Sequence, residues 1–152
     1  MIIEVEKLVF DFLTEKLQDK KVTVYHGLLP EINHEDREEG KSEKDLFPFA
    51  ILRVTKFEQT RNGIDNYDVP VDLEVWIGTK MEDEKDYLNN LSIGDYLKKE
   101  FLNESTVDGK FAVDQSYPFS IEYFTAEAEP YFYSVCRFRV FGVPDTSEVV
   151  ER

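Results

Sequence analysis

The clearest pattern in the chain is an alternation of apolar and other side chains between positions 46 and 77. Residues 49–57 are rich in β-forming side chains. In residues 68–77 every second position is aliphatic, at Val69, Val71, Leu73, Val75 and Ile77. A period of two is typical of a strand with one buried face. Asn62 and Gly63 favour a turn between the runs, because both tolerate positive φ. The pattern predicts a long antiparallel pair at the centre of the fold.

Two other segments have the three- and four-residue spacing of an amphipathic helix. The first begins almost at Met1, and its apolar positions are Ile2, Val5, Leu8, Val9, Phe12, Leu13 and Leu17. The second opens with the acid-rich residues 82–86, which suit the positive end of a helix dipole. It carries a ladder of Ile93, Leu97 and Phe101 and is expected to end near Asn103.

The remaining β-rich runs are residues 22–29, 111–113, 119–126 and 131–141, with turns expected at 108–109 and 128–130. In the last run, parity predicts one face made of Phe132, Cys136, Phe138 and Val140, and the other of Tyr133, Val135, Arg137 and Arg139. The order of elements predicts an α+β domain. We expect a mostly antiparallel four- to five-stranded sheet with two main helices packed on one face.

Residues 31–45 interrupt this order with seven acids, three bases and Ile32 as the sizeable apolar side chain. Such a segment cannot contribute to a core, so we expect an exposed, mobile acidic loop without structure of its own. Whether it orders on a partner is left open. A single domain is expected over residues 1–144, followed by a polar tail at 145–152.

The second face of the sheet is expected to mix aromatic and charged side chains. Trp76, Tyr123, Tyr133 and Val135 are predicted there beside Asp72, Glu74, Glu122, Arg137 and Arg139. This mixture is too apolar for a fully solvated surface and too charged for a core, which is typical of a protein interface. The candidate interface residues are Trp76, Tyr123, Tyr133, Arg137 and Arg139, with Glu35, Asp36, Glu38 and Glu39 of the loop.

Composition narrows the possible partners. The formal charge of −14 and the pI near 4.5 disfavour a grip on nucleic acid or anionic lipid. The acids are spread along the chain, which indicates a solvated surface; an acidic nucleic-acid mimic is the alternative. The single cysteine, Cys136, excludes an internal disulfide and is expected to be a buried core residue. No membrane-spanning run or signal-peptide pattern is present, so we expect a cytosolic protein.

Motifs for catalysis are missing from the sequence. It contains no P-loop, no GxGxxG and no GxSxG element. His26 and His34 have no carboxylate at a matched spacing and are expected to be isolated surface residues. Asp72 and Glu74 share a strand face, but such pairs arise by chance among 32 acids. The sequence therefore predicts no catalytic, cofactor-binding or metal-binding residues, and a protein that is not an enzyme.

Four segments together resemble one family: "FPFAILRVTKFEQ", "YDVPVDLEVWIG", "DEKDYLNNLSIGDYLKKEFL" and "AEPYFYSVCRFRVFGVP". They are similar to the tail terminator (tail-completion, minor tail) proteins of long-tailed phages and prophages. In that family an FP step enters the first sheet strand, an Asp-Tyr stretch precedes the middle helix, and a P-Y turn leads into a final strand ending in Pro. The corresponding residues are Phe47-Pro48, Asp86-Tyr87, Pro130-Tyr131 and Pro144. The loop at residues 31–45 is longer than the family pattern.

The resemblance implies a subunit without an active site that forms a ring, commonly a hexamer. The ring would cap the finished tail tube and face the head connector, so the implied partners are further copies of the chain, the tube protein and the connector proteins. Assembly would take place in the host cytoplasm, and the product would be part of the virion tail. The alternatives are a head-completion or neck protein and, from another class, a small acidic regulatory or inhibitory binding protein, including a DNA mimic.

Overall fold

A computed structural model describes residues 2–58, 60–61, 67–80, 83–103, 106–107, 111–124 and 131–142. The expected turns at 62–63, 108–109 and 128–130, the helix start at 81–82 and the tail at 145–152 lie outside these residues. Within the described ranges, the main sheet has seven strands: β1 (Thr23–His26), β2 (Phe49–Phe57), β5 (Pro70–Lys80), β6 (Thr106–Val107), β7 (Phe111–Val113), β8 (Ser120–Phe124) and β9 (Tyr131–Gly142). The short strands β3 (Thr60–Arg61) and β4 (Tyr67–Asp68) pair separately.

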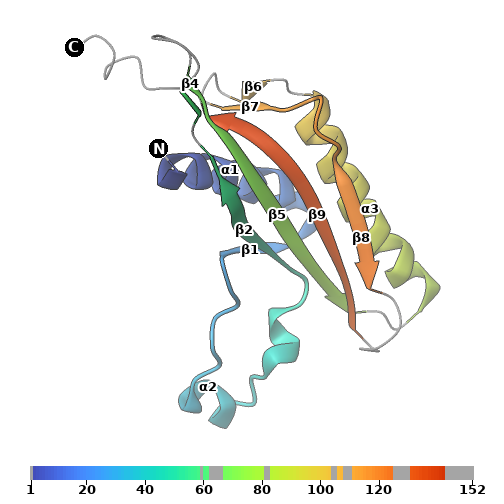
Figure 1. Ribbon diagram of the computed structural model, residues 1–152. Coiled ribbons are helices and arrows are strands. Elements are labelled where there is room, and N and C mark those ends of the chain that lie inside the picture. Colours follow the sequence, from blue (N-terminus) through green and yellow to red (C-terminus); the bar gives the residue numbers. More distant parts are fainter. Residues whose placement is uncertain are drawn as a thin grey trace.

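The centre of the sheet is the predicted antiparallel pair, extended by the last strand. β5 pairs with β2 on one side and with β9 on the other, both antiparallel. The spatial order is β1-β2-β5-β9-β7-β6, and β8 lies beside the other half of β9. Figure 1 shows β5 and β9 running side by side along the length of the main sheet. These two strands contribute residues to both the hydrophobic core and the opposite face of the sheet.

The α+β class and the mostly antiparallel pairing are confirmed, but the main sheet has seven strands among the described residues where four to five were expected. β1 runs parallel to β2, with Thr23 opposite Phe49, so the sheet is mixed. Strands β6 and β7 add two and three residues, lengths at which alternation along the sequence carries little information. Among the described residues there are three α-helices where two main ones were expected: α1 (Ile2–Leu17), α2 (His34–Glu38) and α3 (Glu84–Asn103).

Helices α1 and α3 lie on the same face of the sheet, as the sequence predicts (Figure 1). The buried side of α1 consists of Val5, Val9, Phe12, Leu13 and Leu17. The ladder Ile93, Leu97 and Phe101 forms the buried side of α3. The rings of Phe12 and Phe101 meet at 4.7 Å, and Phe101 contacts Phe138 of β9 at 4.4 Å. The two helices and the sheet therefore share one hydrophobic core.

Cys136 belongs to this core, as its strand parity predicts. Its side chain is fully buried on β9, opposite Val75 of β5. Burial raises the pKa of its thiol to about 12, because a thiolate has little access to water there. The described part of the chain contains no helix both long and apolar enough to cross a membrane.

The connection from β1 to β2, residues 27–48, is called the arm. Its middle part, with α2 (His34–Glu38), extends away from the sheet and both long helices (Figure 1), whereas Gly27 and Phe47 near its ends contact Arg53 and Phe49 of β2. The expectation that residues 31–45 have no structure of their own is wrong. The Asn33 side chain caps α2 by accepting the Asp36 N–H at 2.7 Å, and a 3₁₀ turn follows at Glu43–Leu46. Local caps of this kind need no apolar stripe, so hydrophobic periodicity could not reveal them.

Candidate protein–protein interface

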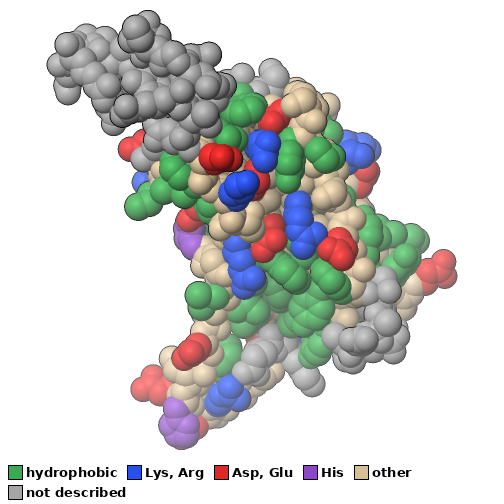
Figure 2. Space-filling view, viewed as in Figure 1, with side chains coloured by type: hydrophobic (Ala, Val, Ile, Leu, Met, Phe, Trp, Pro, Cys, Tyr) green, Lys and Arg blue, Asp and Glu red, His purple; other side chains and the backbone are tan. Residues whose placement is uncertain are grey.

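The sheet face opposite α1 and α3 is called the open face. Strand register places on it Phe49, Ile51 and Arg53 of β2, Asp72, Glu74, Trp76 and Gly78 of β5, Glu122 and Phe124 of β8, and Tyr133, Val135, Arg137 and Arg139 of β9. Figure 2 looks onto this face and shows charged side chains across the sheet with an apolar area beside them, towards the arm. The apolar area is held together by contacts between aromatic rings, and the charged area by ion pairs between strands.

The apolar area is the aromatic cluster, formed by Phe47, Phe49, Trp76, Phe124, Tyr131 and Tyr133. The Phe47 ring lies 4.5 Å from Tyr131 and 4.8 Å from Phe49. Trp76 and Phe124 stack at 5.7 Å with their planes 7° apart. The cluster needs a residue without a side chain beneath it, because a Cβ atom at Gly78 would overlap the Phe49 ring. Backbone and rings therefore fit closely at this end of the sheet.

The charged area is the charged band, formed by Arg53, Lys56, Asp72, Glu74, Glu122, Arg137 and Arg139. Arg139 binds both carboxylate oxygens of Asp72, at 2.6 and 3.2 Å. Arg137 donates to Glu122 at 2.8 Å and lies 3.6 Å from Glu74. These hydrogen bonds raise the pKa of both arginines, which remain charged. Opposite charges on neighbouring strands stabilise a strand pair. Asp72 and Glu74 of β5 lie directly opposite Arg139 and Arg137 of β9, and Glu122 of β8 reaches Arg137 diagonally.

The cations of the band lie further out than two of its three acids. The Asp72 and Glu74 side chains are only 15% exposed, whereas Arg139 is 29%, Arg137 41% and Lys56 62% exposed. Glu122, at 56%, and Glu58, which is 61% exposed and 3.8 Å from Lys56, are as exposed as the cations. This part of the sheet therefore presents both cations and acids to solvent.

Arg53 connects the charged band, the aromatic cluster and the arm. Its Nε donates to the carbonyl oxygen of Gly27 at 2.6 Å, where the arm begins. Its guanidinium lies 5.8 Å from the centre of the Trp76 ring. The indole N–H of Trp76 in turn donates to Glu74 at 2.9 Å. The base of the arm and the open face are thus held as one unit.

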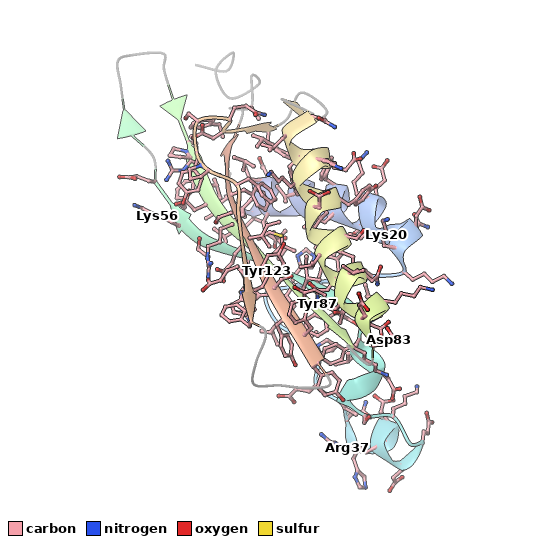
Figure 3. The ribbon with its side chains drawn as sticks, turned by 90° about the vertical axis from the view of Figure 1, so that its right-hand side faces the viewer. Lys20, Arg37, Lys56, Asp83, Tyr87 and Tyr123 are labelled. Carbon is pink, nitrogen blue, oxygen red and sulfur yellow. The ribbon has the colours of Figure 1, made fainter. Side chains whose placement is uncertain are left out.

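Four of the candidate residues lie on the open face as predicted: Trp76, Tyr133, Arg137 and Arg139. The predicted position of Tyr123 is wrong. Tyr123 is opposite Ser134 on the helix-covered face, and its ring stacks on Phe132 at 6.2 Å. Figure 3 shows it beside Tyr87 of α3, and burial raises its pKa. Its sequence neighbour Phe124 takes the place on the open face, since strand neighbours point to opposite sides.

The acidic candidates lie elsewhere. Glu35, Asp36 and Glu38 are in α2, and Glu39 is its C-terminal cap. They lie in the protruding part of the arm (Figure 1), where Lys41 contacts Asp36 at 3.8 Å and Glu39 at 3.6 Å. The fold therefore does not bring them onto the open face of the same chain. Phe47, Phe124 and Tyr131 were not among the candidates, although the aromatic content of their segments was visible in the sequence.

Both histidines have carboxylate partners that spacing along the sequence did not identify. His26 Nδ1 lies 2.7 Å from Glu6 of α1, and its ring stacks on Phe10 at 3.5 Å. His34 Nε2 lies 3.0 Å from Glu38, one turn further along α2. The expectation of isolated histidines is wrong. The first pair joins β1 to α1, and the second lies exposed along α2. The described residues contain no group of three or more potential metal ligands.

No protein-family model matches the chain, and no curated protein sequence is significantly similar to it.

Proposed function

We propose that the protein is a non-enzymatic structural subunit of a phage tail: a tail terminator whose copies form a ring that caps the tail tube and joins it to the head connector. The observation that carries the proposal is the open face. Two helices cover one side of the sheet, while the other presents aromatic rings beside exposed cations. A subunit that assembles with others needs a surface for its partners in addition to the face that its own helices cover.

The two parts of the open face suit different aspects of binding. Aromatic side chains dominate the binding energy of many interfaces, and Phe124 at 41% exposed is available for such contact. Charge pairs contribute mainly to orientation and to the choice of partner. A closed ring needs two different surfaces on each copy, because each contact joins one patch to another around the ring. The proposed partners are further copies of the chain, the tube protein and the connector proteins, in the host cytoplasm and then in the virion.

A second candidate function is that of a small acidic binding protein, including a DNA mimic. The observation that favours it is the arm, where α2 presents Glu35, Asp36 and Glu38 close together on a protruding segment. A mimic would compete with DNA for a DNA-binding partner, whereas a tail subunit would not. A neck or head-completion protein would use the open face in the same way and differs in the particle it completes.

The experiment compares two matched variants in tail assembly. Phe124→Glu places a charge on the aromatic cluster, and Leu88→Glu places one on α3, where Leu88 is 54% exposed away from the open face. Without a terminator, tails of uncontrolled length are expected by electron microscopy. Wild-type protein and Leu88→Glu should restore uniform tails, and Phe124→Glu should not. Normal tails in the absence of the protein would overturn the function, and normal tails with Phe124→Glu would overturn this placement of the interface.

A further inference from the structure

We propose that copies of this chain join edge to edge: the outer edge of β8 in one copy pairs, antiparallel, with the outer edge of β1 in the next. The inference rests on the proposed function, because a ring requires each copy to contact the next. It adds the nature of that contact, a β-sheet shared between copies. Three features of the structure support it: two unpaired strand edges, matching backbone groups on these edges, and exposed apolar side chains beside them.

The first feature is the pair of edges at opposite sides of the main sheet (Figure 1). Among the described residues, β1 pairs with β2 alone and β8 with β9 alone. An unpaired edge presents backbone N–H and C=O groups that favour pairing with a further strand. Neither β1 nor β8 contains the lysine or proline residues that often protect such edges, and the two strands are similar in length, at four and five residues.

The second feature is the set of backbone groups that point outwards from β8. Residues along a strand alternate between bonding to the neighbour on one side and to the neighbour on the other. The Arg139 carbonyl oxygen of β9 accepts the Asp114 N–H, on the side of β9 that faces β7 and β8. The odd-numbered residues of β9 therefore bond to β8, where their partners are even-numbered. This leaves the backbone groups of Ile121 and Tyr123 on the outer edge.

The outward groups of β1 follow from the same alternation. The N–H groups of Thr23 and Gly27 donate to carbonyl oxygens in and beside β2. Val24 and His26 therefore present their backbone groups on the outer edge of β1. Each of the two edges thus offers two residues, spaced two apart, for pairing with another strand.

These groups match in an antiparallel joint. Tyr123 pairs with Val24 of the next copy, and Ile121 with His26, so that each pair exchanges N–H···O bonds. The His26 carbonyl oxygen already accepts the Leu28 N–H, but a carbonyl oxygen has two lone pairs. The paired side chains all lie on the helix-covered side of their own copy. Since opposed residues share a face, the joint keeps the helices of both copies on one side and both open faces on the other.

Charge favours this joint over one between two β8 edges. In the joint, Glu122 lies opposite Tyr25 of the next copy. Arg53 of that copy is bound at Gly27, two residues from Tyr25, so this edge offers Glu122 a charge of opposite sign. Two β8 strands paired through the same outward groups would instead place Glu122 opposite its own counterpart, and directly opposed like charges are destabilising. Because β1 and β8 are different surfaces, their joint is head-to-tail and can close into a ring.

The third feature is the apolar side chains beside both edges. On β8, Tyr123 is 38% and Phe124 41% exposed. At the other edge, Leu28 follows β1 and is 67% exposed, and Ile3 is 79% exposed one turn before Glu6, which contacts β1. Apolar surface removed from water at the joint adds to the stability that the backbone bonds supply.

The test is a disulfide across the joint in the full chain. Tyr25→Cys and Glu122→Cys proteins are mixed and oxidised, because directly opposed residues of this kind have Cα atoms about 4.5 Å apart, within disulfide range. The control mixture combines Tyr25→Cys with Ser120→Cys, which lies two residues out of register. The native thiol of Cys136 is buried with a pKa of about 12 and should not compete. Covalent dimers are measured by gel electrophoresis without reductant, and thermal unfolding confirms that each variant is folded.

The mixture in register should give about tenfold more covalent dimer than the control mixture or than either variant alone, because only its Cα atoms lie within disulfide range. Equal yields in the two mixtures overturn the register. A Glu122→Cys protein that cross-links with itself as well as with Tyr25→Cys overturns the choice of β1 as the partner edge.

A second comparison tests the backbone groups. Tyr123→Pro removes an outward N–H, which an edge strand tolerates, and Tyr123→Ala removes the same ring but keeps the N–H. Added to the Glu122→Cys protein, Tyr123→Pro should lower the cross-link to Tyr25→Cys about tenfold below the Tyr123→Ala level, because it removes a hydrogen bond of the joint. Equal cross-linking overturns the backbone pairing. These experiments use this protein alone, so their failure leaves the proposed function to the tail assays with Phe124→Glu and Leu88→Glu.

Discussion

The helix-covered face and the open face of the sheet are made by the same strands, which contribute alternate residues to each. On the covered face β5 presents Val71, Leu73, Val75 and Ile77, all fully or almost fully buried. On the open face the same strand presents Asp72, Glu74 and Trp76, each with a specific partner on another strand or on β5 itself. The covered face is stabilised by apolar burial beneath two helices. The open face keeps its polar groups satisfied by pairing them across strands.

This difference separates stability from binding. Burial of apolar area is the main favourable term in folding, whereas ion pairs at a surface contribute little to it. The covered face should therefore determine whether the protein folds, and the open face what it contacts. Substitutions on the two faces test this separation, and those with the largest expected effect come first.

Phe101→Ala, in the part of α3 that packs on the covered face, should have the largest effect. The ring is fully buried and contacts Phe12 and Phe138, so its removal should lower the free energy of unfolding by about 3–5 kcal/mol. The matched change on the open face, Phe124→Ala, should cost about 1 kcal/mol or less, since that ring is partly solvated. Chemical denaturation measures both values. Equal losses would show that the two faces contribute alike to stability.

Gly78→Ala should have the next largest effect and tests how closely the open face is packed. The new Cβ would overlap the Phe49 ring, and moving that buried ring should cost about 1–3 kcal/mol. Gly94→Ala in α3 is the control. Its Cβ would lie 3.3 Å from the end of the Ile121 side chain, and the cost is offset by the better helix propensity of alanine. A neutral Gly78→Ala variant would mean that the aromatic cluster is loosely packed.

Cys136→Ala should lower the free energy of unfolding by about 1–2 kcal/mol, as a small core truncation. Thiol reagents should label the native protein far more slowly than the denatured one. The folded pKa of about 12 is above the ordinary value of 9.0, so the thiol's contribution is complete below about pH 9 and is lost as pH rises towards 12. In that range wild type should lose stability more steeply than Cys136→Ala. Identical slopes would contradict a buried thiol.

Replacing residues 31–45 by a short Gly-Ser linker should have the smallest effect on stability. The described side chains of this segment are exposed or partly exposed, and loop-closure entropy changes slowly with length. We expect a change of less than about 1 kcal/mol in thermal unfolding together with impaired tail completion. A loss of several kcal/mol would mean that the arm supports the core. Unchanged stability with normal tails would leave the arm without a role in assembly.

By itself, the sequence determined the local elements. The period of two in β5, the three- and four-residue spacing in α1 and α3, and the side-chain parity of β9 are all properties of neighbouring residues. When one side of a helix or strand is buried, apolar residues recur along the sequence at the period of that element, so the spacing alone predicts it. The α+β class, the buried position of Cys136 and the open-face positions of Trp76, Tyr133, Arg137 and Arg139 follow from them.

Only the tertiary structure decided how these elements meet. The parallel pairing of β1 with β2, the position of Phe124 rather than Tyr123 on the open face, and the pairing of His26 with Glu6 join residues far apart in the chain. A strand's alternation predicts two faces but not which of them meets the core, because that choice depends on its register with a neighbouring strand. The core that α1, α3 and the sheet build together selects the register. The open face is what this selection leaves uncovered.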